Sequence, residues 1–191
     1  MSAFFHQLPK AELHLHLEGS IEPETLRELA PACSLEEIRE HYLYDGFQGF
    51  LQSYAWVTRH LRAPQDYALI TRRLLERLAS ENVRYAEITL SAGVILWRDQ
   101  ELGPIYEAVR RESLSSPVEV WWLFDGVRHF GVEHVQRVAE LAAERLKDGV
   151  IGLGIGGDEA RGPAEIFKDV YRFARQKGLR LTAHAGEACG A

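Results

Sequence analysis

Residues 8–20, LPKAELHLHLEGS, restrict the possible folds of this chain more than any other stretch. Successive side chains of an extended strand point to opposite faces, so apolar and polar residues are separated here. The apolar face would carry Leu13, Leu15 and Leu17, and the polar face would carry Glu12, His14, His16 and Glu18. Buried imidazoles and carboxylates each need a partner. A divalent metal ion would supply one, and a solvent-exposed edge strand is the alternative.

The rest of the chain alternates between short runs rich in branched or aromatic residues and segments with apolar residues at helical spacing. We expect strands at residues 83–90, 118–124, 150–156 and 179–184. We expect helices at residues 23–30 and 101–113, and on the apolar stripes within 67–78, 135–146 and 166–173. Strands that alternate with helices in this way predict a parallel α/β architecture.

The polar residues inside the first strand distinguish between the two common parallel folds. An interior strand of an open, doubly wound sheet is apolar on both faces, whereas ligands inside a barrel mouth project from the strand itself. We therefore predict a (β/α)8 metal-dependent hydrolase barrel. Such a barrel has eight strands and typically about 250 residues. Residues 1–191 are thus expected to be the N-terminal part of a single barrel domain, truncated after about the fifth strand.

Residues 34–62 are expected to form a helical insertion that acts as a lid. Ser34 and Glu37 form a capping-box pattern, which predicts the start of a helix. The apolar stripe that follows consists of Phe47, Phe50, Leu51, Tyr54 and Leu61. Aromatic residues at helical spacing could line a ligand pocket, but ordinary core packing is the more frequent explanation and is expected for most of them.

A second group of polar residues follows the last expected strand, where His184 is succeeded by Glu187. Together with His14 and His16, these residues supply three imidazoles and one further carboxylate. That is the inventory of a catalytic zinc site with an adjacent general acid or base. The sequence therefore favours a metal site over a simple edge strand.

Three motifs carry a close resemblance to the adenosine deaminase family of the amidohydrolase superfamily. They are LPKAELHLHLEGS at 8–20, GIGGDE at 154–159 and HAGE at 184–187, in this order. The resemblance extends from about residue 8 to the last residue. It implies a hydrolase with one zinc ion per subunit that converts the 6-amino group of an adenine-type purine to a 6-oxo group and ammonia.

The resemblance also implies a role for each matched residue. His14, His16 and His184 match zinc ligands, Glu187 matches the catalytic glutamate, Gly157 matches the glycine whose backbone approaches the purine, and Glu18 lies near the ribose end of the substrate. Asp158 is a weaker candidate for a supporting contact. The family's water-orienting histidine and its zinc-ligand aspartate match no residue here. The isolated chain is therefore expected to be inactive, and a catalytically inactive barrel fragment is the alternative from another class.

Glu18 leaves the substrate open. Adenosine-specific members of the family commonly have aspartate at this position, one methylene shorter. Relatives with glutamate include proteins similar to adenine deaminases and to aminodeoxyfutalosine deaminases. The resemblance therefore implies an adenosine-like nucleoside as substrate, with adenine or aminodeoxyfutalosine as the alternatives.

Three other site types are disfavoured by the sequence. Gly152, Gly154 and Gly157 spell a G-x-G-x-x-G pattern, but Asp158 and Glu159 follow where a pyrophosphate would lie. Barrel phosphoesterases also begin with His-x-His, but they need further His and Asp ligands and a basic phosphate contact. The H-x-E and P-C-x-x-C signature of cytidine-deaminase-like enzymes is absent from the sequence.

The composition excludes several partner classes. Lys and Arg total 22 against 28 Asp and Glu, a net charge of -6, without a basic stripe, so nucleic acid is not expected. A signal peptide and an apolar segment of about 18 residues are both lacking, so we predict a cytoplasmic protein that does not cross a membrane. Cys33 and Cys189 lack a disulfide or metal-binding spacing. The oligomeric state is not predicted.

Overall fold

The computed structural model describes residues 3–187 and 189–190. The strands form a 5-stranded sheet in the order β1-β2-β3-β4-β5, the order of the sequence. They are β1 (Lys10–His16), β2 (Val83–Leu90), β3 (Glu119–Val127), β4 (Val150–Gly156) and β5 (Arg180–Leu181). The pairs β3–β4 and β4–β5 are parallel. The predicted parallel α/β class is therefore confirmed.

The last strand is shorter than the expected range of 179–184. β5 contains only Arg180–Leu181, yet its hydrogen bonds to β4 continue beyond that point. The backbone N–H of Thr182 donates to the Leu153 carbonyl at 3.0 Å, and that of His184 donates to the Ile155 carbonyl at 2.9 Å. These bonds fix the backbone of His184 against β4, so the end of the run is positioned by the sheet although it is not regular strand.

The chain divides into two compact units, the first formed by residues 1–86 and 103–120 and the second by residues 87–102 and 121–191. The helices with most or all of their residues in the first unit are α1 (Ala3–Gln7), α2 (Pro23–Leu29), α3 (Leu35–His41), α4 (Gly46–Thr58), α5 (Pro64–Ser80) and α7 (Leu102–Leu114). The expected stripe of α5 is buried at Tyr67, Ile70, Leu74 and Leu78.

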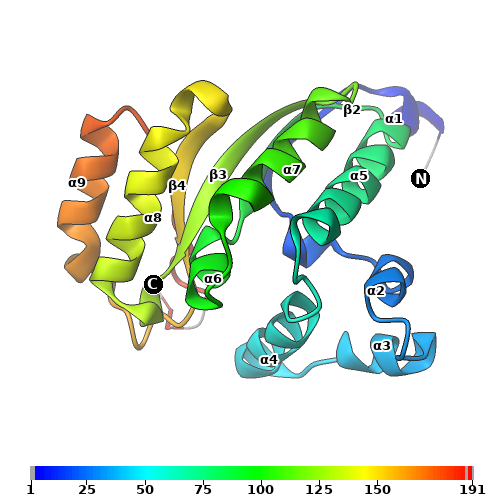
Figure 1. Cartoon of the computed structure of the whole chain (residues 1–191), viewed down its shortest axis with the longest axis horizontal. Coiled ribbons are helices and arrows are strands. Elements are labelled where there is room, and N and C mark those ends of the chain that lie inside the picture. Colours follow the sequence, from blue (N-terminus) through cyan, green and yellow to red (C-terminus); the bar gives the residue numbers. More distant parts are fainter. Residues whose placement is uncertain (1–2, 188, 191) are drawn as a thin grey trace. The chain divides into compact units, whose positions relative to one another are not determined.

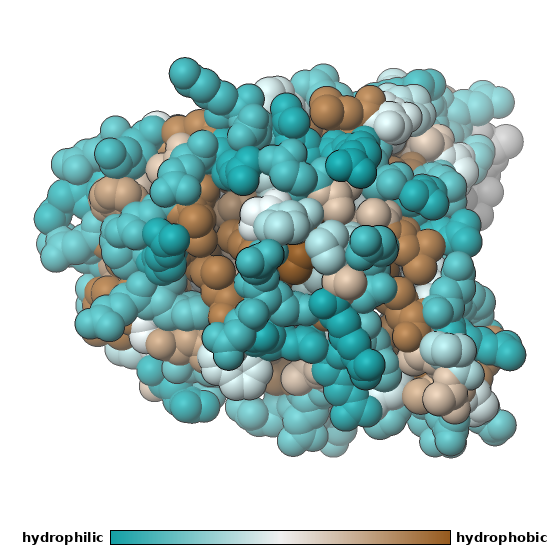
Figure 2. Space-filling model, in the orientation of Figure 1, coloured by the Kyte–Doolittle hydropathy of each residue, from teal (hydrophilic) through white to brown (hydrophobic). Residues whose placement is uncertain are grey.

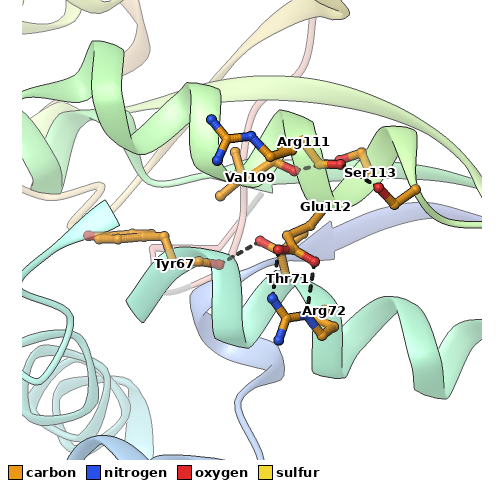
Figure 3. Close-up of polar contacts among 8 residues, drawn as sticks. Tyr67, Thr71, Arg72, Val109, Arg111, Glu112 and Ser113 are labelled. Atoms are coloured by element: carbon orange, nitrogen blue, oxygen red, sulfur yellow. Dashed lines mark hydrogen bonds and ion pairs between the residues drawn. The ribbon is translucent and has the colours of Figure 1, made fainter. Parts of the chain in front are cut away.

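Helices α5 and α7 of the first unit run beside each other and are joined by an ion pair (Figures 1 and 3). The Arg72 guanidinium donates to both carboxylate oxygens of Glu112, at 3.0 and 2.8 Å. The pair lowers the pKa of the Glu112 carboxyl below its usual value. Because the Arg72 side chain is 53% exposed, water screens this attraction, and the buried apolar stripe is the larger contribution to the packing.

The insertion at 34–62 forms the two expected helices, α3 and α4. The capping box at the start of α3 is confirmed, because the Ser34 hydroxyl accepts from the Glu37 N–H at 3.1 Å and the Glu37 carboxylate accepts from the Ser34 N–H. The aromatic stripe is less buried than ordinary core packing requires. Phe50 and Tyr54 are half-buried, whereas Leu61 is fully buried. These rings lie at the surface of α4 because its buried side chains, at Val57 and Thr58, occupy only its last turn.

The second unit places one helix against β4 and a second helix beside it, against β5. The first is α8 (Val132–Glu144) and the second is α9 (Lys168–Gln176), and the two lie side by side (Figure 1). A shorter helix, α6 (Ala92–Trp97), contacts α8. Figure 2 shows that hydrophilic residues cover most of the face drawn there and that hydrophobic colour is divided among small areas. Within the described residues, none of the helices combines the length and apolarity needed to cross a bilayer.

Two details of the expected helices are wrong. The stripe of α8 is buried at Val138 and Ala142, but Leu146 lies beyond the helix in a half-exposed 3-10 turn that ends at left-handed Gly149. The helix expected on the stripe within 166–173 begins only at Lys168, and Ile166 in the preceding 3-10 turn is 46% exposed. A 3-10 turn has three residues per turn, so an apolar stripe spaced for an α-helix does not stay on one face.

Candidate active site

His14 and His16 lie in β1 of the first unit, and their rings converge. Their Nε2 atoms are 3.3 Å apart and their ring centroids are 5.2 Å apart. Two nitrogens bound to one tetrahedral zinc ion at about 2.0–2.1 Å would be separated by about 3.3 Å. The pair therefore has the nitrogen spacing that a shared zinc ion requires. The i, i+2 spacing produces it because both side chains project from the same face of the strand.

The opposite face of β1 is only partly buried. Leu17, which directly follows the strand, is fully buried, but Leu13 is 64% exposed and Leu15 is half-buried. The expectation of a continuous apolar face against a core is therefore wrong at Leu13. Ala11, which lies on the same face two positions earlier, is exposed as well, so this face of β1 is uncovered along the first half of the strand.

Glu18 lies in a 3-10 turn (Glu18–Ser20) directly after β1 and is 2% exposed. The Tyr54 hydroxyl of α4 donates to the Glu18 Oε2 atom at 3.4 Å. The insertion thus brings a polar group to the Glu18 carboxylate. Sequence reasoning did not assign Tyr54 this role, because its only local signal was membership of an apolar stripe.

The second unit brings His184 and Glu187 together. The His184 Nδ1 atom lies 3.4 Å from the Glu187 Oε2 atom, and the two side chains are 26% and 39% exposed. The His184 carbonyl accepts a hydrogen bond from the Arg128 guanidinium, which also donates to the Gly162 carbonyl at 3.2 Å. Arg128 is 4% exposed. It therefore holds the backbone of the candidate metal ligand from inside the protein.

Arg128 was missed by sequence reasoning, although one signal was available. It follows the apolar run of β3 (Glu119–Val127), and a charged residue that directly follows a buried parallel strand lies at the carboxyl edge, where barrel enzymes have their sites. No residue spacing could have connected Arg128 with the carbonyl of His184, which is 56 positions away. The contact exists because both lie at the same end of the sheet.

Gly157, the residue matched to the purine-approaching glycine, follows β4 in a left-handed conformation with φ +92°. A Cβ atom added there would lie 2.8 Å from the His129 Nδ1 atom. That nitrogen accepts a hydrogen bond from the Asp158 N–H at 3.2 Å. Asp158, the weaker candidate, uses its own Oδ1 atom to accept from the Ala160 N–H at 3.1 Å, which closes a local turn. The turn is therefore held by the side chains of His129 and Asp158.

Gly157→Ala is expected to lower the free energy of unfolding by about 1–3 kcal/mol, because alanine is strained at positive φ and its methyl group would displace His129. Urea unfolding of the purified chain measures the loss. Gly178→Ala is the matched control, since Gly178 has φ +93° and a methyl group added there would meet no atom within 4 Å. An equal loss in both variants would contradict a specific contact between residue 157 and His129.

His129 provides a prediction for pH. Burial lowers the pKa of its imidazole below the ordinary value of 6.5, the Arg161 charge lowers it further, and Asp158 opposes the shift. Below pH 6.5 the unfolded chain therefore binds the proton more readily than the folded chain, and stability falls as pH decreases. Between pH 7.5 and 5.5, urea unfolding should show a larger loss for the wild type than for His129→Asn, whose amide oxygen can still accept from Asp158. Equal losses would contradict the prediction.

The glycines of β4 explain the G-x-G-x-x-G pattern without a nucleotide. A Cβ atom added at Gly154 would lie 2.9 Å from the Asp125 Oδ1 atom, and one added at Gly156 would lie 3.3 Å from its Oδ2 atom. Asp125 belongs to β3 and is 7% exposed. The small residues therefore leave room for a buried carboxylate between two strands. Gly152 and Gly154 also lie inside a strand, and α9 begins only at Lys168, which disagrees with a phosphate-binding turn at a helix start.

A parallel α/β sheet with a His-x-His pair on its first strand belongs to the (β/α)8 barrel class, whose sites lie at the carboxyl ends of the strands. Comparison with known proteins makes the assignment more specific. The chain belongs to the adenosine deaminase family, which matches residues 9–191. Its solved relatives include an amidohydrolase from Burkholderia ambifaria with bound Zn, at 28% identity and a TM-score of 0.85, covering 97% of this chain and 55% of that one.

Two curated relatives are similar along the whole chain. An adenine deaminase from Rhizobium etli is 34% identical and covers 96% of this chain and 60% of its own length. An aminodeoxyfutalosine deaminase from Streptomyces avermitilis is 32% identical and covers 100% of this chain and 57% of its own length. The chain therefore spans about 60% of the length of the curated relatives it matches.

Proposed function

We propose that the whole protein is a zinc-dependent deaminase that hydrolyses the 6-amino group of an adenine-type purine to a 6-oxopurine and ammonia. The observation that carries the proposal is the 3.3 Å separation of the His14 and His16 Nε2 atoms, in a chain of the adenosine deaminase family. The ammonia-releasing chemistry of the curated relatives supports the reaction type.

The proposed metal ligands are His14, His16 and His184. Their donor chemistry suits zinc, which binds imidazole nitrogen in sites with an open position. For His184 we assign Nε2 to the ion, because Nδ1 faces Glu187. A carboxylate on the second ring nitrogen orients a ligating imidazole and raises its basicity. The ion, when bound, would supply Lewis acidity that lowers the pKa of water to around 7.

The proton transfers are assigned to Glu187. Its carboxyl group would give a proton to N1 of the adenine ring as water adds to C6. The resulting carboxylate would take a proton from the added water and give it to the departing amino group. As ammonia leaves, the remaining proton of the new C6 hydroxyl would return to Glu187, so that the 6-oxo group forms and the carboxyl group is restored. A carboxyl group can perform these steps because it acts as a general acid when protonated and as a general base when ionised.

Substrate orientation is assigned to Gly157 and Glu18. Gly157 carries no Cβ atom, so a planar base can approach its backbone closely. The Glu18 carboxylate, held by the Tyr54 hydroxyl, would accept hydrogen bonds from the far side of the base or from a sugar. Its glutamate identity and the adenine deaminases among the relatives favour adenine over adenosine as substrate, with an aminodeoxyfutalosine-like nucleoside as the second candidate.

The test is an ammonia-release assay with adenine, adenosine and an aminodeoxyfutalosine-like nucleoside. It is performed on this chain and on a form extended by the C-terminal part that the curated relatives possess. We expect one zinc ion per chain and ammonia release in the extended form alone. A folded, zinc-loaded extended form that deaminates none of the three would overturn the proposed function.

A further inference from the structure

Glu159 of the second unit connects two loops that carry proposed site residues. Its Oε1 atom accepts a hydrogen bond from the Gly186 N–H at 2.8 Å, and its Oε2 atom accepts one from the Cys189 N–H at 3.3 Å. These two amides lie on either side of Glu187 in the sequence. We propose that Glu159 is a positioning residue that fixes the loop carrying Glu187, and thereby the direction of its carboxylate. The catalytic part of this inference rests on the proposed function.

The loop that carries Glu187 needs hydrogen bonds from another segment to fix its conformation, because two of its residues are glycines with a left-handed backbone. Gly186 has φ +73° and Gly190 has φ +78°. Glycine has the largest conformational freedom of any residue, so local geometry alone specifies such a turn poorly. A single carboxylate that accepts one N–H on each oxygen restrains both sides of the turn at once. Hydrogen bonds to an ionised acceptor are also stronger than those between neutral groups.

Glu159 can restrain the Glu187 loop because hydrogen bonds also fix the turn in which Glu159 lies. The His129 imidazole accepts from the Asp158 N–H, and the Asp158 carboxylate accepts from the Ala160 N–H. Glu159 lies between these two bonds. The same turn contains Gly157, the residue proposed to meet the purine. The backbone contact for the base and the loop of the proton-transferring glutamate are therefore held by one short segment, 157–160.

The arrangement predicts which property changes when Glu159 is replaced. Loss of the two hydrogen bonds of Glu159 would change the alignment of the Glu187 carboxylate with N1. It would leave the binding of the base to Gly157 largely intact. A misplacement of about 1 Å at a catalytic group can cost about 100-fold in rate. We therefore expect kcat to fall by about 10- to 100-fold in Glu159→Ala, with KM and zinc content changed less than about 3-fold.

Hydrogen exchange of individual backbone amides tests whether Glu159 restrains the Glu187 loop, and it can be measured in this chain without any enzyme activity. Amide hydrogen exchange at Gly186 and Cys189 should be about 10-fold faster or more in Glu159→Ala than in the wild type. Glu159→Gln keeps the size of the side chain but presents only one acceptor oxygen. It should leave one of the two amides protected and expose the other. Glu165→Gln, an exposed acidic residue of the same unit, is the matched control and should change neither amide.

The outcomes separate the inference from the proposed function. Unchanged exchange at both amides in a folded Glu159→Ala chain overturns the proposal that Glu159 restrains the Glu187 loop. If the Glu159→Ala variant shows faster exchange but the wild-type kcat in the extended form, Glu159 restrains the loop without affecting catalysis. That result overturns the expected fall in kcat. A wild-type extended form without any deaminase activity refutes the proposed function, while the exchange result still decides whether Glu159 holds the loop.

Discussion

Glu187→Gln in the extended, active form is expected to reduce kcat for deamination by about 100- to 10,000-fold, the usual contribution of a positioned general acid or base. Glutamine has nearly the same size and can still contact the His184 Nδ1 atom, but it cannot give up and recover a proton at the working pH. Steady-state ammonia release with the preferred purine measures the loss. Zinc content should stay at the wild-type value, because Glu187 is not among the proposed ligands and the amide oxygen of glutamine can still accept a hydrogen bond from the His184 Nδ1 atom.

The control for this substitution is Glu165→Gln, which removes a carboxylate from an exposed site in the same unit. It should retain wild-type kcat and zinc. If Glu187→Gln kept more than about a tenth of the wild-type kcat, the proton transfers would have to be assigned elsewhere. If instead it lost zinc together with activity, the role of Glu187 would be to orient His184 as a ligand.

The sequence predicted those parts of the fold that depend on local patterns. The bounds of β2 and β4 agree with the expected 83–90 and 150–156, because most residues of both runs are buried and each run begins with a branched apolar residue. The capping box at the start of α3 was equally predictable from the sequence, since its two residues, Ser34 and Glu37, are only three positions apart. Where a 3-10 turn replaced the start of a helix, at residues 164–167, the helical pattern misplaced Ile166.

The supporting contacts of the candidate site could not be predicted in the same way. Tyr54 reaches Glu18 across 36 positions, Arg128 reaches the His184 carbonyl across 56, and Glu159 reaches Gly186 across 27. None of these separations has a periodic signal, because each contact depends on which segments of the folded chain lie next to each other. The motifs therefore identify the groups that do chemistry, whereas the groups that hold them in place become visible only in the folded chain.

The second prediction with a large expected effect concerns the affinity of the chain for zinc. His16→Ala and His184→Ala are each expected to lower zinc affinity by at least about 100-fold, since loss of a contact that merely supports a ligand already costs about 10- to 100-fold. Competition with a chromophoric chelator measures the affinity in this chain. His6→Ala replaces an exposed histidine and should leave zinc affinity unchanged.

The double variant His16→Ala, His184→Ala decides whether one ion is shared. Ligands of the same ion are coupled, so the loss in the double variant should differ from the product of the two single losses, whereas independent sites would give the simple product. Stoichiometry provides the second criterion. A wild-type chain that binds two zinc ions, of which each single variant loses one, would show that His16 and His184 serve separate sites and would refute the three-histidine centre on which the proposed deaminase depends.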